Sequence, residues 1–428
     1  MIPIIEMAEV QNFIEKYKSR HRQISLKVHS VVREILGSVE QKGDESLYEY
    51  SLQFDNADLK QLGLVVPEDE IEEAVRSTPP DFLSILNRSA ENIRKYHKKT
   101  KQTSWLSWEE DGVILGQRVT PIRRIGIYVP GGQAAYPSSL IMAAVPAQVA
   151  EVEEIAIVTP PNRDGKIHPT ILSAAHVLGI EEIYRIGGAQ AVAALAFGTA
   201  SVHRVDKIVG PGNSYVAEAK RQVFGLVDID MIAGPSEVVI LADQTAEPAY
   251  IASDLLAQAE HDTLASSLCV TSDTGLAEAT REAVIKQGTA LPRKRIFQSA
   301  LADWGGILLV ENMSRGIELV NELAPEHLEL HVANPWEILG GIQNAGAIFL
   351  GSYSPETVGD YWAGPNHILP TNRTARFSSP LGTEDFQKKS SLIQYPKEAL
   401  GKNAQAIITF AEKEGLDGHA QAVRQRTG

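Results

Sequence analysis

Short runs of β-branched and other apolar residues alternate with alanine-rich helical segments, and this alternation constrains the fold more than any other feature. A first series of runs lies at residues 125–129, 154–158, 182–186 and 206–209, with helices predicted near 138–150, 169–178, 189–197 and 213–223. A second series lies at 238–241, 267–270, 306–310, 326–330 and 347–350. Strands that alternate with helices form parallel sheets, so the pattern predicts an α/β protein with two open, incomplete Rossmann-like sheets.

The sequence pattern predicts helical extensions at both ends of the chain. Before the first series, two segments from residues 24 and 79 carry apolar positions at three- and four-residue intervals, and a hairpin-like stretch covers 112–132. After Leu381 the strand signals fade, and the tail reads as two short helices broken at Gly415 to Gly418. We therefore divide the chain into an N-terminal helical segment (1–24), a first α/β domain (25–127 plus 236–381), a second α/β domain (128–235) and a helical tail (382–428).

Length and charge exclude several classes of protein. With 428 residues the chain is too long for one ordinary core, which agrees with two major domains. The formal net charge of −14 disfavours a nucleic-acid partner, and no long Lys/Arg run compensates for it locally. The N-terminus lacks a signal-peptide core and no stretch approaches about 18 apolar residues, so we expect a cytoplasmic protein without a membrane partner.

The single cysteine limits the chemistry of any metal site. Cys269 lies in the apolar run SSLCVT, where it is expected to be a small core residue. It cannot form an intramolecular disulfide, and one thiol cannot build a thiolate cage. A bound metal must therefore be held by nitrogen and oxygen ligands.

Three glycine-rich turns follow predicted strands. They are YVPGG at 128–132, IGGAQ at 186–190 and VGPGN at 209–213. Glycine permits tight turns, and helix N-termini attract anions, so each turn could approach a phosphate group. None matches G-x-G-x-x-G, and such turns are often purely structural, so both interpretations stay open.

Scattered polar residues offer ligands for a metal ion. In LLAQAEHD, Gln258 and His261 stand three apart on a helix, so that their side chains share one face, although a polar helix end would look the same. His and carboxylate ligands suit zinc and related ions. The strings GDYWAGPNH and EGLDGH add the further candidates Asp360, His367, Glu414 and His419.

Two other positions allow a catalytic or a structural interpretation. In LAPEHLEL the carboxylate of Glu326 precedes the imidazole of His327, a group that can shuttle protons near neutral pH, but such pairs are often incidental. Ser236 stands just before the strand at 238–241, where its hydroxyl can orient a ligand or cap the turn.

The strings in combination resemble one family. YVPGG, GGAQAVAALAFGT, VGPGN, AGPSE, QAEHD, APEHLEL, GDYWAGPNHILPT, TARFSSPLG and EGLDGHA are similar to the histidinol dehydrogenases in identity, order and spacing from residue 128 to residue 420. The sequence departs mildly from the family, since no proline follows QAEHD in TLASSLCV and GTEDFQKKSS replaces a stretch that commonly contains an aromatic residue.

The resemblance implies an enzyme that oxidises L-histidinol to L-histidine with two NAD⁺ and one zinc ion per subunit. It implies that Glu326 and His327 are the catalytic acid/base residues and that zinc is held by Gln258, His261, Asp360 and His419. The histidinol site would be lined by Ser236, Gln258, His261, His327, Asp360, His367, Glu414 and His419. The NAD-contacting positions would be Tyr128, Gln190 and Asn213, in the domain of residues 128–235.

The resemblance also implies a homodimer with shared active sites. Members of the family are similar in that the C-terminal segment crosses to the partner, so Glu414 and His419 would complete the neighbouring subunit's site. The first α/β domain would then carry substrate and zinc. This arrangement would explain why a helical tail carries ligands.

Three alternatives differ in class. A paralogous zinc/NAD alcohol dehydrogenase would act on another amino alcohol or a sulfonated diol, but the chain keeps both Glu414 and His367. A zinc hydrolase would need no nucleotide, and the chain lacks H-E-x-x-H. A catalytically inactive nucleotide-binding protein would be expected to have lost Glu326, His327 or a candidate metal ligand, and all these residues are present.

Overall fold

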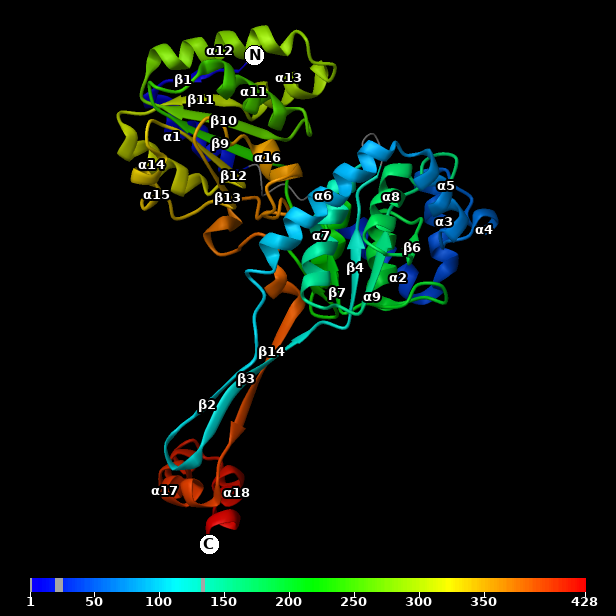
Figure 1. Ribbon diagram of the computed structural model, residues 1–428, viewed down its shortest axis with the longest axis vertical. Coiled ribbons are helices and arrows are strands. Elements are labelled where there is room, and N and C mark those ends of the chain that lie inside the picture. The colour runs from blue at the N-terminus through cyan, green and yellow to red at the C-terminus, as the bar shows by residue number, and fades with distance from the viewer. Residues whose placement is uncertain (1, 20–25, 132–134) are drawn as a thin grey trace.

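Two parallel sheets flanked by helices and one antiparallel arm make up the computed structural model, which describes residues 2–19, 26–131 and 135–428 (Figure 1). The α/β class with two open parallel sheets is therefore confirmed. Each run predicted as a strand contains one. Within the described residues, no helix combines the length and the apolarity that crossing a membrane requires.

The larger sheet has six strands in the order β1-β11-β10-β9-β12-β13, and all its neighbouring pairs are parallel. The strands are β1 (Ile4–Ile5), β9 (Glu237–Ala242), β10 (Ser266–Thr271), β11 (Gly306–Leu309), β12 (His327–His331) and β13 (Ala347–Leu350). One face is covered by α11 (Pro248–Ala259), α12 (Thr274–Gly288) and α13 (Lys294–Asp303). The other is covered by α1 (Met7–Ser19) and α14 (Met313–Leu323), and the short helices α15 (Pro335–Leu339) and α16 (Glu356–Tyr361) complete this half.

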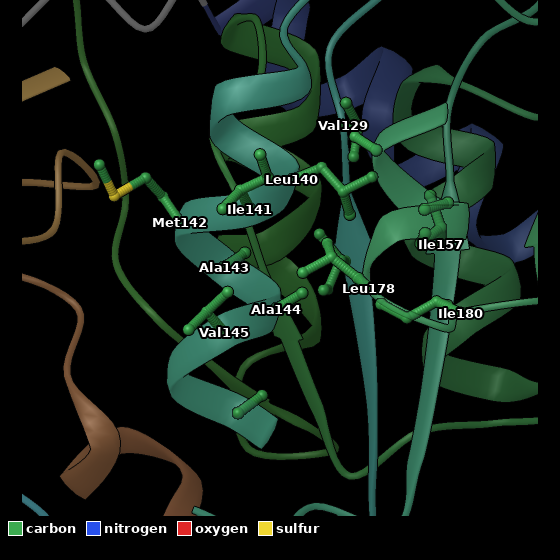
Figure 2. Packing of buried hydrophobic residues seen from close by; sticks show 14 of the residues in the cluster. Val129, Leu140, Ile141, Met142, Ala143, Ala144, Val145, Ile157, Leu178 and Ile180 are labelled. Carbon is green, nitrogen blue, oxygen red and sulfur yellow. The ribbon is translucent and has the colours of Figure 1, made fainter. Parts of the chain in front are cut away.

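The smaller parallel sheet has five strands in the order β6-β5-β4-β7-β8. They are β4 (Arg124–Tyr128), β5 (Glu154–Val158), β6 (Ile183–Tyr184), β7 (Lys207–Val209) and β8 (Asp228–Ile229). On one face lie α7 (Pro137–Val149) and α8 (Pro169–Val177), and on the other α9 (Gly188–Phe197) and α10 (Ser214–Val223). Figure 2 shows Leu140 of α7 directed toward the sheet, near Val129 and Ile157. Burial of such side chains is the main favourable term holding the helices to the sheet.

The packing differs from the predicted domain division at the N-terminal side. Five helices that we grouped with residues 236–381 pack instead around the five-stranded sheet: α2 (Leu26–Lys42), α3 (Asp44–Asp55), α4 (Leu59–Leu62), α5 (Glu68–Ser77) and α6 (Pro80–His97). The segment predicted over 1–24 supplies β1 and α1 to the six-stranded sheet, and its residues 20–24 lie outside the described residues. An amphipathic pattern indicates that a helix buries one face, but not against which sheet.

The third sheet forms an arm with the C-terminal helices at its far end (Figure 1). Strand β3 (Ile114–Pro121) pairs antiparallel with β2 (Trp105–Trp108) and β14 (Gln387–Gln394), with the 3₁₀ turn η2 (Glu110–Gly112) between β2 and β3. The hairpin predicted over 112–132 is therefore wrong, because β4 leaves the arm and joins the five-stranded sheet. Beyond β14 lie α17 (Lys397–Lys413) and α18 (Asp417–Thr427), and the turns η3 (Thr374–Arg376) and η4 (Thr383–Phe386) precede it.

Candidate active site

The predicted site residues gather at the edge of the six-stranded sheet where its strands begin. Glu326 and His327 stand at the start of β12, and Ser236 immediately precedes β9. Helix α11 connects β9 to β10, so it runs back toward this edge and delivers Gln258 and His261 at its end. The side chains of one helix and two strands therefore meet at one place.

Helix α16 and the residues after it bring the remaining predicted site residues of this half, and helix α6 of the other half anchors α16. Asp360 lies on α16 and is 9% exposed, and His367 follows the helix. The Ser89 hydroxyl of α6 donates to the carbonyl of Tyr361 at 2.7 Å, and the Asn92 amide donates to the carbonyl of Trp362 at 2.9 Å. These bonds hold the end of α16 against α6, so the contact between the two halves positions Asp360.

The imidazoles converge on the Asp360 carboxylate. Its Oδ1 lies 3.6 Å from Nδ1 of His367 and 3.9 Å from Nε2 of His327. One ligand atom from each of His261, Glu356 and Asp360 lies within 4.8 Å of the others. The structure therefore brings His261, His327, Asp360 and His367 together as the resemblance implied.

His327 is held as a base whose free nitrogen faces the site. It is 5% exposed, and its Nδ1–H donates to the backbone carbonyl of Glu237 at 3.2 Å. A carbonyl only accepts, so Nε2 carries the lone pair, and this atom is buried without a hydrogen-bond partner. Burial lowers the pKa of the imidazole, while the charge of Asp360 opposes this effect. His327 is therefore a neutral proton acceptor.

Glu326 is oriented by the same backbone position. Its Oε2 accepts a hydrogen bond from the N–H of Glu237 at 2.9 Å and lies 3.8 Å from Nδ1 of His327. The side chain is 7% exposed, so the carboxyl group is fixed inside the site. Glu237, the first residue of β9, thus orients both members of the Glu-His pair through its own N–H and C=O groups.

The two carboxyl groups of α16, those of Glu356 and Asp360, favour different protonation states. Burial raises the pKa of Glu356 well above its ordinary value, and the charge of Asp360 adds to this effect. Burial also acts to raise the pKa of Asp360, but the hydrogen bond and charge of His367, with His327, lower it overall. Glu356 thus favours the protonated form and Asp360 the ionised form, so Asp360 carries negative charge toward the imidazoles.

The amide of Gln258 lies between two acidic residues. With its nitrogen toward Glu356, it donates to the two carboxylate oxygens at 2.6 and 3.1 Å and accepts from the N–H of Glu237 at 2.7 Å. In the opposite orientation the amide oxygen faces the carboxylate, which requires a cation or a proton between the oxygens. Gln258 is fully buried, so its amide group must find its hydrogen-bond partners in one of these two arrangements.

The structure does not bring Glu414 and His419 to this cluster. Both are exposed, Glu414 at the end of α17 and His419 in α18, at the far end of the arm (Figure 1). Ser236 is half-buried beside the cluster, and its carbonyl accepts from the N–H of Ser266 at 2.9 Å. One chain therefore assembles the site without the two tail residues.

The three positions expected to contact NAD lie where strands of the five-stranded sheet end. Tyr128 ends β4, and its hydroxyl accepts from the N–H of Gly188 at 3.1 Å, while burial raises its pKa to about 12. Gln190 is 1% exposed, and its Oε1 has no partner. Asn213 caps α10 by accepting from the N–H groups of Tyr215 and Val216. Asn213 therefore has a structural task, and Gly132 of the first turn lies outside the described residues.

A buried ion pair supports the VGPGN turn. Lys220 donates to the carbonyl of Gly210 at 3.0 Å and pairs with Asp230, whose Oδ2 accepts from the N–H of Gly210 at 2.8 Å. Gly210 has a φ of 110°, and a Cβ there would lie 2.1 Å from the carbonyl oxygen of Tyr128. Glycine is therefore required where β4 and β7 end side by side.

We expect Asp230→Asn to lower the free energy of unfolding by about 3–5 kcal/mol, because it leaves the Lys220 ammonium buried without its counter-charge. Denaturant unfolding of the purified protein measures this effect. Asp228→Asn is the matched control, since Asp228 is half-exposed and its partner Lys207 also lies 4.0 Å from Asp385. It should cost at most about 1 kcal/mol. Equal losses of unfolding free energy in the two variants would contradict the stabilising role given to the buried Lys220–Asp230 pair.

Sequence reasoning missed two acidic residues of the cluster. Glu356 is 2% exposed, with Oε2 3.9 Å from Nδ1 of His327, and Glu237 orients Glu326 and His327 as described above. A signal for Glu356 was available, because it stands four residues before Asp360 and so shares its helix face. No sequence signal identifies Glu237, because it acts through its backbone.

Comparison with known proteins agrees with this geometry. The model of the histidinol dehydrogenase family matches residues 18–427. Histidinol dehydrogenase of Moorella thermoacetica is 50% identical over 427 residues, covering 100% of both chains, and that of Bacillus subtilis is 53% identical over 395 residues, covering 92% of each. The crystal structure of histidinol dehydrogenase from Elizabethkingia anophelis superposes with a TM-score of 0.94 at 36% identity, covering 99% of this chain and 98% of that chain. The chain therefore belongs to the histidinol dehydrogenase family of oxidoreductases.

Proposed function

We propose that the chain oxidises L-histidinol through L-histidinaldehyde to L-histidine and reduces two NAD⁺ in doing so. Family membership supports the reaction. The observation that carries it is His327, a buried neutral imidazole whose free Nε2 faces the ionised Asp360. Oxidation of an alcohol releases a proton with each hydride, and a group of this kind accepts that proton at neutral pH.

The donor set fits a zinc ion. His261 and Asp360 supply an imidazole and a carboxylate whose ligand atoms lie close together, and Gln258 supplies an amide beside them. The amide oxygen of Gln258 can face Glu356 only with a cation or a proton between the oxygens, and a bound ion would supply the first of these. We propose that Gln258, His261 and Asp360 of one chain and His419 of a second chain hold the ion. When bound, it anchors and orients the amino alcohol and supplies electrostatic stabilisation.

The residues of the Glu-His pair divide the proton chemistry. In the first step Nε2 of His327 takes the hydroxyl proton of L-histidinol while the hydride leaves for NAD⁺, which gives the aldehyde. In the second step Glu326 takes a proton from water as the water adds to the aldehyde, and His327 returns the proton from the first step to the aldehyde oxygen, which gives the hydrate. His327, neutral again, then accepts a proton from the hydrate as its hydride leaves for the second NAD⁺. Ser236 and His367 line the binding site for L-histidinol, and Glu414 of the second chain pairs with a cationic group of this substrate.

We also propose that NAD binds where the strands of the five-stranded sheet end. Tyr128, Gln190 and Asn213 lie there beside the glycine-rich turns, and the unpartnered Oε1 of Gln190 offers a buried acceptor. Asn213 contributes by holding the start of α10, where the partial positive charge of the helix N-terminus attracts anions.

The distance of the tail from its own site supports a dimer with shared sites. Helices α17 and α18 lie at the end of an extended arm, and apolar side chains are exposed there, including Ile393, Phe410 and Leu416. An arm of this kind can place Glu414 and His419 against a second copy. The proposal therefore requires residues of two chains in each site.

Mixed dimers should recover activity that neither parent has. We expect His327→Gln and His419→Gln to be inactive alone, but co-refolding them in equal amounts should restore about a quarter of wild-type activity, because half of the dimers combine both chains and one of their two sites is intact. Steady-state NADH formation measures this recovery. A mixture that stays inactive, with heterodimers shown by differently tagged chains, would place both residues in the site of one chain.

The direct test follows NADH with L-histidinol as substrate. The zinc-loaded protein should form two NADH for each L-histidine identified by chromatography, chelation should abolish the reaction, and added zinc should restore it. A protein that binds zinc but forms no NADH from L-histidinol would overturn the proposal in favour of a dehydrogenase for another amino alcohol or a sulfonated diol. A screen of such alcohols would then identify the substrate.

A further inference from the structure

Strand β12 carries polar residues along one whole face, of which the proposed reaction uses only the first. Side chains alternate between the two faces of a strand, so His327, Glu329 and His331 share one face, and Leu328 and Leu330 the other. The leucines belong to the core beneath α1 and α14. The polar face lies against α11 and α16 and continues behind the candidate active site.

Three side chains on this face form a second cluster. Asp254 of α11, Glu329 and His331 are 8%, 0% and 1% exposed, and one ligand atom from each lies within 4.8 Å of the others. Nε2 of His331 lies 3.2 Å from Oε2 of Glu329 and 3.8 Å from Oδ2 of Asp254. The cluster contains none of the residues to which a zinc ligand or a catalytic role was assigned above.

Two atoms of the cluster, Oε2 of Glu329 and Nε2 of His331, are arranged as ligands rather than as hydrogen-bonded partners. Despite the 3.2 Å separation, neither Oε2 of Glu329 nor Nε2 of His331 makes a hydrogen bond. Ligands about 2.0–2.1 Å from a tetrahedral ion are roughly 3.3 Å from one another. The two atoms thus lie at the separation expected when both point toward a common centre.

The charge of the cluster also calls for a cation. Among the described residues, Asp254 and Glu329 each form an ion pair with the imidazole of His331, and neither forms one with a lysine or arginine. An ionised carboxylate in the interior needs a counter-charge or a proton. One imidazole cannot compensate two carboxylates, so either a metal ion or an extra proton must be present.

We propose that Asp254, Glu329 and His331 bind a divalent transition-metal ion at a second site, behind the one that holds the catalytic zinc. One imidazole and two carboxylates are a ligand set suited to Zn²⁺ or Mn²⁺. The other oxygen of Glu329, Oε1, accepts from the N–H of Glu356 at 2.7 Å, at the start of α16. An ion held by Glu329 therefore fixes the helix that carries Asp360.

Metal content and its position test the proposal without any use of L-histidinol. The complete protein is stripped with a chelator, incubated with excess Zn²⁺ and desalted, and zinc per chain is measured by mass spectrometry. A crystal of the same sample gives anomalous difference maps at the zinc absorption edge. We expect two ions per chain, with an anomalous peak between Glu329 and His331.

Variants separate the two sites. Glu329→Gln and Asp254→Asn should each lower zinc content from two ions per chain to one, whereas Asp360→Asn should lose the other ion and keep the peak beside Glu329. Asp243→Asn is the matched control, because Asp243 follows β9 and its carboxylate accepts from the N–H groups of Thr245 and Ala333, outside the cluster. It should keep both ions.

An absent peak beside Glu329 in the zinc-loaded wild type would overturn the proposal and assign the cluster to a proton shared by Asp254 and Glu329. Burial and the charge of Glu329 raise the pKa of Asp254 to about 8, so that form is available to the metal-free protein. If Glu329→Gln does not fold, Asp254→Asn and the wild-type map still decide the question. Failure of L-histidinol oxidation would leave this metal count unchanged, so the two proposals fail separately.

Discussion

We expect His327→Gln to slow both oxidations by about 10²–10⁴-fold, the usual contribution of a positioned acid/base group. Glutamine keeps a polar side chain of similar length but cannot take up a proton at neutral pH. Because the alcohol and the hydrate each lose a proton with the hydride, both steps depend on Nε2. Single-turnover NADH formation from L-histidinol and from L-histidinaldehyde measures the two steps separately.

A matched histidine controls for this change. His176 is exposed on α8, so His176→Gln should retain the wild-type rates. Zinc content and thermal unfolding of His327→Gln should equal those of the wild type, because His327 is not among the proposed zinc ligands. A loss in only one oxidation, or a loss that zinc content explains, would remove His327 from its role as the shared base.

Glu326→Gln should separate the two oxidations. The amide oxygen of glutamine can still accept from the N–H of Glu237, so His327 keeps its position and the alcohol step should proceed nearly as before. The aldehyde step should slow by about 10²–10⁴-fold, because glutamine cannot take a proton from the adding water. The first-turnover yield should fall from two NADH per L-histidinol toward one, and trapping with a carbonyl reagent should detect the aldehyde.

The control for Glu326→Gln uses a carboxylate outside the site. Glu318 lies on α14 with its side chain 66% exposed, so Glu318→Gln should keep two NADH per substrate. Equal slowing of both oxidations by Glu326→Gln would contradict the division of roles. In that case Glu326 would serve both steps, for example by orienting His327.

The parallel sheets were the most predictable part of the fold. Runs such as 154–158 and 238–241 are continuous and apolar because both faces of each sheet are covered, and this composition identifies a buried strand locally. Strand β14 could not be found in this way. Its sequence QKKSSLIQ is mostly exposed, and it becomes a strand because β3 offers it a complete edge for pairing.

The site was predictable as a set of residues but not as an arrangement. Resemblance supplied Gln258, His261, His327 and Asp360, and the structure brings their side chains together. Glu356 and Glu237 were missed. The spacing of Glu356 from Asp360 indicates a shared helix face but not that the carboxyl group is buried in the site, and Glu237 acts through its backbone. The protonation states also lay outside local reasoning, since burial and neighbouring charges shift each pKa.

What the amino-acid sequence determined by itself was local: the periods of its apolar residues, the glycine at position 210 and the residue types of a nitrogen and oxygen ligand set. The tertiary structure alone decided which sheet each N-terminal helix covers, that β12 turns a polar face toward α11 and α16, and that the tail lies far from its own site. The reason is that periodicity reports only that a face is buried. Contacts between residues such as Ser89 and Tyr361, 272 positions apart, depend on how all the elements pack together.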